Sequence, residues 1–443
     1  LGVYRRTATG TVKSVGSITI PVIMVEFSDL KFQDTVTVEK VQRQLTEEGY
    51  HDEPQTAGCT RDYFKTMSMG RFDPDFRVVA KVTLDESYAT YGAHAGSSND
   101  ADPVGMVKAA IKKAAEQGVD FYQYIESRVS GAVPLISIMY AGYAESGNVF
   151  GEEAYEDYIW PHFSTGINYT YTGFEVTNSK GNKTRFSSYF VGNELKEDLK
   201  IVQGSYVRDG SSIEGINTFI HEFGHALGLP DFYCTNYGHS AVTMGMRDIM
   251  DYGSYFRDGR TPPPYSVYER SFMGWLPKLV ELEGEGEHRL YSMESGRTDS
   301  IAFILRNPQN SKEYYLLENR QNSAFSNADE MGHGLYVIHV DYSYALWNQN
   351  SLNNTRDHLR MTFVPADGKL QSQPSTNFYG VQNWSSFLGD LYPGTSGNSE
   401  LTDESSPATS VFTGAGLGQP IYDIREEDGV IIFNFMKPGE NTS

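Results

Sequence analysis

The chain has 443 residues, of which 57 are acidic and 36 are Lys or Arg, so its formal net charge is −21. Nucleic acids and anionic membrane surfaces attract basic patches, and this charge balance argues against both as main partners. Aromatic residues make up 13% of the chain, which is typical of a folded core and not of a disordered chain.

The first part of the chain alternates predicted strands and helices. Strands are expected where β-branched and apolar residues run together, and helices where apolar residues recur three and four positions apart. We predict strands at 17–27, 77–84 and 133–140, helices at 36–48, 60–69, 103–117 and 213–227, and a hairpin or excursion at 163–188. Such alternation predicts a sheet with helices packed on it.

The pattern changes after the proline-rich connector at 261–264 and one further helix expected at 265–272. From Leu276 onward, short β-prone runs alternate with Gly, Pro, Asn and Ser, and this spacing indicates a β-rich, sandwich-like domain. Its strands are expected at 301–305, 314–318, 335–340, 359–363 and 430–435. The overall prediction is therefore an α+β protein with a first domain at 1–275 and a β-rich domain at 276–443.

Neither a membrane span nor a signal peptide is expected. The longest run without a charge, 129–144, is interrupted by Ser, Gly and Pro and is shorter than the roughly 20 apolar residues that a span needs. The first ten residues, LGVYRRTATG, lack the apolar segment of a leader. With two cysteines, Cys59 and Cys234, one disulfide is possible, and two unpaired thiols are the default expectation.

The strongest chemical signal is HEFGHALGLPD at 221–231. His221 and His225 are four positions apart on a predicted helix, so both imidazoles project from one face and can reach one metal ion. Glu222 would face water at that ion without ligating it. Three protein ligands and one open position are typical of catalytic zinc. HExxH arises by chance in roughly one chain in seventy of this composition, so two unrelated core histidines are the weaker interpretation.

The third ligand has two candidates. Gly228 can end the helix in the left-handed conformation and Pro230 prevents it from resuming, so the chain turns back and offers the Asp231 carboxylate to the metal. The competitor is Glu269 on the later predicted helix, by analogy with thermolysin-like enzymes. The turn chemistry favours Asp231.

Downstream, the run DIMDYG at 248–253 places Met250 in a tight turn and Tyr252 two residues later. In metzincins a methionine turn lies beneath the zinc site. A tyrosine at this spacing can hydrogen-bond the tetrahedral intermediate. The alternative is a core methionine beside a surface tyrosine.

Together these motifs resemble the immune inhibitor A-like family of bacterial secreted metallopeptidases, zinc enzymes related to the metzincins. The resemblance covers most of the chain and includes VIMVEFSD at 22–29, RDYFKTMSMGRF at 61–72, VDFYQY at 119–124, MYAGYAE at 139–145, IWPHF at 159–163, HEFGHALGLPDFY at 221–233, DIMDYGSY at 248–255, PPYSVYERSFMGWL at 263–276, YYLLENRQ at 314–321 and GLYVIHVD at 334–341.

The resemblance implies a metzincin-like zincin fold for the first domain. It assigns the zinc ligands His221, His225 and Asp231, the catalytic base Glu222 and the methionine-turn residue Met250. It also implies a secreted or cell-surface bacterial protein whose leader has been removed, and we see no separate prodomain. Structural calcium is expected from family habit and from the acidic loops, although no run matches an EF-hand.

The resulting prediction is a secreted zinc endopeptidase that acts on protein or peptide substrates, with Glu222 as general base, Tyr252 holding the oxyanion and a monomeric state favoured. Two other interpretations stay open. One is a catalytically idle homologue that binds proteins or glycans through the β-rich domain. The other is a zinc hydrolase that acts on a small amide.

Overall fold

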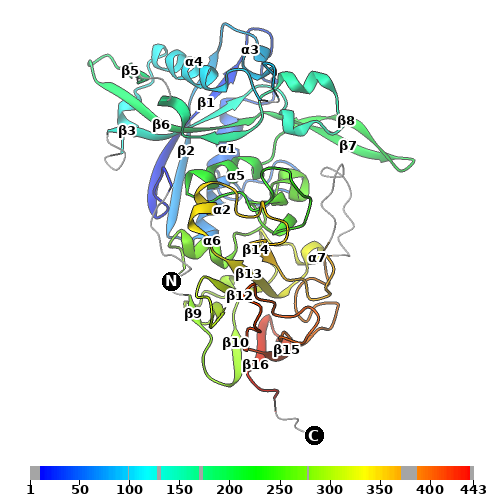
Figure 1. Ribbon diagram of the computed structural model, residues 1–443. Coiled ribbons are helices and arrows are strands. Elements are labelled where there is room, and N and C mark those ends of the chain that lie inside the picture. Colours follow the sequence, from blue (N-terminus) through cyan, green and yellow to red (C-terminus); the bar gives the residue numbers. More distant parts are fainter. Residues whose placement is uncertain are drawn as a thin grey trace.

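The computed structural model describes residues 10–97, 99–126, 131–168, 173–276, 279–370 and 387–439. It is a mixed α/β structure (Figure 1). A sheet of six strands lies at one end, a β-rich part at the other, and a layer of helices between them.

The structure assigns eight α-helices to the described residues. They are α1 (Val38–Thr46), α2 (Thr60–Met67), α3 (Tyr88–Gly92), α4 (Pro103–Glu116), α5 (Asn217–Ala226), α6 (Val267–Phe272), α7 (Ala328–Met331) and α8 (Tyr344–Asn348). Two 3₁₀ segments near the site are η6 (Gly245–Arg247) and η7 (Tyr252–Gly259), the second with a kink inside it.

The strands run through the whole chain. They are β1 (Gly16–Glu26), β2 (Phe72–Thr83), β3 (Ala132–Tyr140), β4 (His162–Ser164), β5 (Glu175–Thr177), β6 (Lys183–Asn193), β7 (Leu195–Val202), β8 (Ser205–Ile213), β9 (Val280–Glu281), β10 (Gly286–Leu290), β11 (Ala302–Arg306), β12 (Glu313–Arg320), β13 (Gly334–Asp341), β14 (Met361–Phe363), β15 (Ile421–Glu427) and β16 (Val430–Phe435).

The six-stranded sheet has the order β2-β1-β3-β6-β4, with β5 also paired to β6. The pairs among β1, β2, β3 and β6 are parallel, whereas β4 and β5 run antiparallel to β6. Both faces are covered, as parallel strands require. Alternate residues of β1 belong to two different hydrophobic cores. Val22 and Met24 belong to the central core, which lies between the sheet and helices α1, α2 and α5. Ile23 and Val25 belong to the upper core, which lies between the sheet and helix α4.

In the β-rich part, a five-stranded sheet (β14-β13-β12-β11-β9) and a three-stranded sheet (β10-β16-β15) share a lower core. The other face of the five-stranded sheet belongs to the central core. Leu316 and Ile338 of this sheet therefore lie in the same cluster as Phe223 of α5 and Trp275. The predicted boundary at 275/276 is crossed by one continuous core, and the division into two domains stays a prediction.

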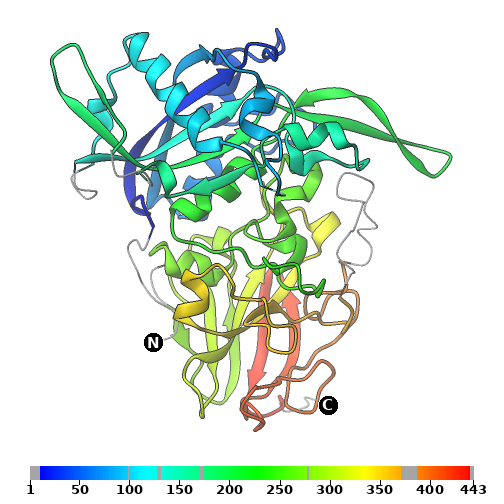
Figure 2. The same cartoon turned by 45° about the horizontal axis from the view of Figure 1, so that its top comes forward.

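Most elements expected from the sequence are present, with ends shifted by a few residues. Helix α5 begins at Asn217 and not at Ile213, because Ile213 still pairs with Leu195 in the β7–β8 hairpin. That hairpin was not predicted, and it projects from the body of the molecule (Figure 2). The stretch 163–188 contributes β4, β5 and β6, although residues 169–172 lie outside the described part. No helix among the described residues has the length and apolar character to cross a membrane.

Candidate metal centre and active-site cleft

Helix α5 carries His221, Glu222 and His225, and its C-terminal end directs the chain back toward them. Gly228 has φ +99°, a conformation that glycine adopts without a Cβ penalty. The N–H of Gly228 donates to His225 O, and the N–H of Leu229 donates to Gly224 O. These two bonds form a Schellman motif. The predicted helix end is thus confirmed, and Asp231 follows directly after the turn.

His221, His225 and Asp231 converge. The Nε2 atoms of His221 and His225 lie 3.0 and 3.2 Å from Asp231 Oδ1. His221 and Asp231 are buried and His225 is partly buried, and their ligand atoms lie within 4.8 Å of one another. Asp231 Oδ1 is buried and receives no hydrogen bond of good geometry. A buried oxygen of this kind needs a cation or a proton, and two imidazoles with one carboxylate are a common donor set for zinc.

The second nitrogen of each imidazole is held by the backbone. His221 Nδ1 lies 2.7 Å from Ile249 O, and His225 Nδ1 lies 2.8 Å from Leu229 O. A carbonyl accepts but cannot donate, so both Nδ1 atoms carry a proton, and in the neutral imidazoles both Nε2 lone pairs point to the common centre. The residues present therefore fit a metal ion bound through the Nε2 atoms and Asp231.

The electrostatics agree with this fit. Burial alone lowers the pKa of a histidine, yet the carboxylates of Asp231 and Glu222 raise the pKa of His221, and they raise the pKa of His225 to about 9. Burial favours a protonated Asp231, but the two histidines hold the pKa of this carboxyl below its ordinary value. Two buried carboxylates thus demand positive charge at the centre of the site.

Glu222 lies beside the centre and outside the ligand set. Its carboxylate oxygens are each 4.0 Å from an imidazole Nε2, one from His221 and one from His225. The side chain is 7% exposed and lines the cavity in front of the helix. It is therefore placed to act on a molecule at the centre without binding the ion itself.

The competing candidate for third ligand, Glu269, does not join this group in the described part of the chain. It caps α6: Glu269 Oε1 accepts from the N–H and the hydroxyl of Ser266. The charge of its carboxylate also acts on the buried carboxyl of Asp248, in the segment leading to Met250. Of the two candidates that the sequence leaves open, Asp231 is the one that meets the histidines.

Met250 packs directly below the helix that carries the histidines. A Cβ on Gly224 would come to 2.5 Å from Met250 Sδ, so the glycine is what admits the methionine at this distance. Ile249, the preceding residue, supplies the carbonyl that orients His221. The methionine segment, residues 248–253, thus contacts α5 through packing and through one hydrogen bond.

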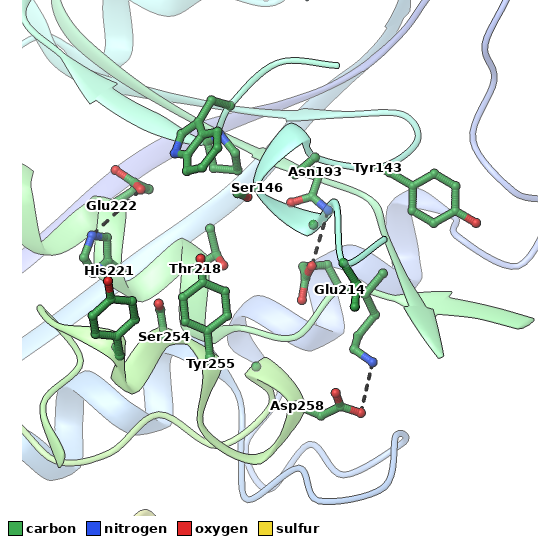
Figure 3. A pocket seen from close by; sticks show the side chains of 18 of the residues that line it. Tyr143, Ser146, Asn193, Glu214, Thr218, His221, Glu222, Ser254, Tyr255 and Asp258 are labelled. Carbon is green, nitrogen blue, oxygen red and sulfur yellow. Dashed lines mark hydrogen bonds and ion pairs between the residues drawn. The ribbon is translucent and has the colours of Figure 1, made fainter. Parts of the chain in front are cut away.

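A cavity of about 300 Å³ opens in front of the centre and is lined by Glu222, Tyr252 and Thr218 among others. Figure 3 shows His221 and Glu222 at one end and Glu214 with Asp258 at the other. Burial raises the pKa of Tyr252 to about 12, so its phenol keeps its proton at neutral pH and can donate a hydrogen bond. Tyr252 is therefore a half-buried part of the cavity wall and not a surface residue.

Several residues of the site were not found from the sequence. Tyr233 and Thr218 line the same cavity, and their positions beside HEFGHALGLPD were the available signal. Asn350 binds Asp231 from 119 residues away, and no local pattern marks it.

Cys59 and Cys234 are buried free thiols. Cys59 Sγ accepts from Asp62 N at the start of α2, and Cys234 donates to Asn236. Structural calcium stays a prediction.

Comparison with known proteins places the chain in a family. Residues 6–275 match the family model described as immune inhibitor A peptidase M6, catalytic domain. Immune inhibitor A of Bacillus thuringiensis subsp. alesti is 25% identical over 304 residues, which are 60% of this chain and 41% of the relative. The pre-pro-metalloprotease PrtV of Vibrio cholerae serotype O1 (strain M66-2) is 24% identical over 232 residues, which are 48% of this chain and 23% of the relative.

The chain therefore spans less than half the length of the curated relatives that it matches. The match of residues 6–275 includes α5, Asp231 and the methionine segment, and it confirms the resemblance seen in the sequence. The chain belongs to the immune inhibitor A family of M6 peptidases.

Proposed function

We propose that the protein is a zinc endopeptidase that cleaves protein or peptide substrates and is secreted from, or displayed on, a bacterial cell. The observation that carries this proposal is the convergence of His221, His225 and Asp231, with Glu222 4.0 Å from both imidazoles at the wall of a cleft. Membership of a peptidase family and the word metalloprotease in the name of PrtV support it.

In this proposal, His221 Nε2, His225 Nε2 and an oxygen of Asp231 hold the ion. When bound, zinc supplies a Lewis acid that polarises the scissile carbonyl and makes water a nucleophile near neutral pH. Glu222 takes the proton of the attacking water and passes it to the leaving amine. The phenol of Tyr252 donates a hydrogen bond to the oxyanion as its charge develops.

The position of the upper sheet's edge strand favours a peptide as the substrate. Strand β4 is the terminal strand of the sheet order and contacts α5. Trp160 and Pro161, directly before β4, line the cavity that holds Glu222. An extended chain can add to an edge strand through main-chain hydrogen bonds, which fits a substrate read mainly by its backbone.

The test compares wild type with Glu222→Gln on an unfolded protein, with zinc content measured on both. We expect stoichiometric zinc in both samples and a loss of about 10²–10⁴-fold in cleavage rate for the variant, the usual contribution of general acid–base catalysis. The matched control is Glu283→Gln, the same change at an exposed position.

Equal cleavage by Glu222→Gln and wild type would exclude this mechanism. Zinc-loaded wild type that cleaves neither unfolded proteins nor a peptide library would instead indicate an idle, binding homologue. Cleavage of small amides alone would indicate a non-peptidase hydrolase.

A further inference from the structure

A segment outside the matched catalytic region reaches the metal centre. Helix α8 ends at Asn348, and Asn350 has φ +52°, in the left-handed region that asparagine tolerates better than most residues. The N–H of Asn350 donates to Trp347 O and the N–H of Ser351 donates to Leu346 O, so α8 ends in a Schellman motif, as α5 does. The helix end thereby fixes the backbone of Asn350.

The side-chain amide of Asn350 binds Asp231 at two points. Asn350 Nδ2 donates to Asp231 Oδ2 at 2.8 Å, and Asp231 N–H donates to Asn350 Oδ1 at 2.7 Å. One oxygen of the carboxylate is thus occupied by a hydrogen-bond donor. The other, Oδ1, is left facing the two imidazoles. The amide therefore selects which oxygen is presented to the metal and limits rotation of the carboxylate.

Residues next to Asn350 also bind the loop that follows α5. Trp347 Nε1 donates to Gly228 O at 3.0 Å, and Asn353 Nδ2 donates to Phe232 O at 2.6 Å. Asn354 binds Thr235, four residues beyond Asp231, through its amide. Residues 347–354 therefore hold the loop that follows α5, and Asn350 is the member of this segment that contacts a ligand side chain.

We propose that Asn350 is a positioning residue for the third metal ligand, so that the metal centre of the matched catalytic region is completed by a residue from the β-rich part of the chain. This inference rests on the proposed metal site. Outer hydrogen bonds to ligating side chains fix their orientation, and their removal typically weakens metal binding 10–100-fold. The amide is neutral, so it orients Asp231 without neutralising the charge that the cation needs.

The decisive variant is Asn350→Gly in the full chain, since glycine keeps the left-handed helix end and removes only the amide. Zinc affinity is measured by competition with a chromophoric chelator, and the melting temperature is measured on metal-free protein. We expect zinc affinity to fall 10–100-fold. The melting temperature of the metal-free protein should change no more than in Asn354→Ala, a control on the same segment that loses an amide bound to Thr235.

Zinc affinity within twofold of wild type in Asn350→Gly would overturn the proposal. An equal loss of affinity in Asn354→Ala would overturn it as well, because the effect would then belong to the segment and not to the amide on Asp231. Affinity is measured independently of cleavage. If zinc affinity depends on Asn350 as expected but the wild type cleaves nothing, the proposed peptidase function is excluded and the role of Asn350 is retained.

Discussion

The residues of the proposed metal centre are each held by a group that has no part in the proposed chemistry. Two backbone carbonyls fix the protonated nitrogens of His221 and His225, and an amide fixes one oxygen of Asp231. Each of these bonds removes one alternative orientation of a ligand before any ion arrives. Such pre-organisation lowers the entropy cost of ordering the ligands when metal binds. It depends on the packing of three separate segments around α5.

Tyr252 offers a prediction at this scale. Its phenol is protonated at neutral pH, burial raises its pKa further to about 12, and it lines the cavity beside Glu222. If it donates to the oxyanion, Tyr252→Phe removes a bond that is made in the transition state and not in the substrate complex. We expect kcat to fall by about 10²–10³-fold with little change in KM, measured by steady-state cleavage of a fluorogenic peptide.

Tyr255→Phe is the matched control, since it removes a phenol from the same cavity wall. Its kcat should stay within a few-fold of wild type. A rise in KM at constant kcat for Tyr252→Phe would instead mean that this tyrosine only binds substrate.

At the scale of elements, the methionine segment and α6 each contribute one carboxyl group to an interacting buried pair. Asp248 and Glu269 are fully buried, and two such carboxylates cannot both be charged without a large electrostatic cost. Burial and then the charge of Glu269 raise the pKa of Asp248 well above its ordinary value. Asp248 Oδ1 also accepts from Met250 N–H at 2.8 Å, so Asp248 shapes the turn that carries the Ile249 carbonyl.

The raised pKa predicts a pH dependence of stability. Protonated Asp248 stabilises the folded state. This contribution to the unfolding free energy is fully present below the unfolded pKa of Asp248, about 4, and is lost as pH rises toward the folded pKa. In Asp248→Asn, the side-chain amide keeps an acceptor oxygen for the Met250 N–H and an NH₂ donor for Glu269. Unlike the carboxyl group, the amide does not ionise in this pH range. We expect the unfolding free energy of wild type to fall, relative to this variant, by up to about 1.4 kcal/mol per pH unit in that window.

Urea denaturation of metal-free protein from pH 4 to pH 9 measures this difference. Parallel curves for wild type and Asp248→Asn would contradict the raised pKa of Asp248. The other charged groups that act on the pair, chiefly Arg320, are present in both proteins and cancel in the comparison.

The elements also show how far the sequence could predict the site. The spacing of His221, Glu222 and His225 and the helix-ending Gly228 are local features, and local chemistry determined where these side chains lie. The β7–β8 hairpin was missed because most of it is exposed and no burial pattern marks it, although the β-prone Ile201 and Val202 lead into a turn where Gln203 and Gly204 both have positive φ. Asn350 could not be predicted, since its role depends on packing between segments far apart in the chain.

At the scale of the whole molecule, the central core joins the upper sheet to the β-rich part. A buried ion pair reinforces the connection. Arg247, in η6 just before the methionine segment, lies 2.9 Å from Asp390, and both side chains are almost fully buried. Arg247 Nη2 also donates to Phe387 O. A shared core and a buried pair of this kind predict that the two parts unfold together.

Arg247→Ala tests this coupling. It leaves the buried carboxylate of Asp390 without this cation, which typically costs about 3–5 kcal/mol, whereas Arg77→Ala breaks an exposed pair with Asp75 and should cost about 1 kcal/mol or less. Calorimetry of the metal-free chain should give one transition for all three proteins, shifted as a whole in Arg247→Ala. Two transitions, of which only one moves, would show that the predicted boundary at 275/276 separates independently folding domains despite their common core.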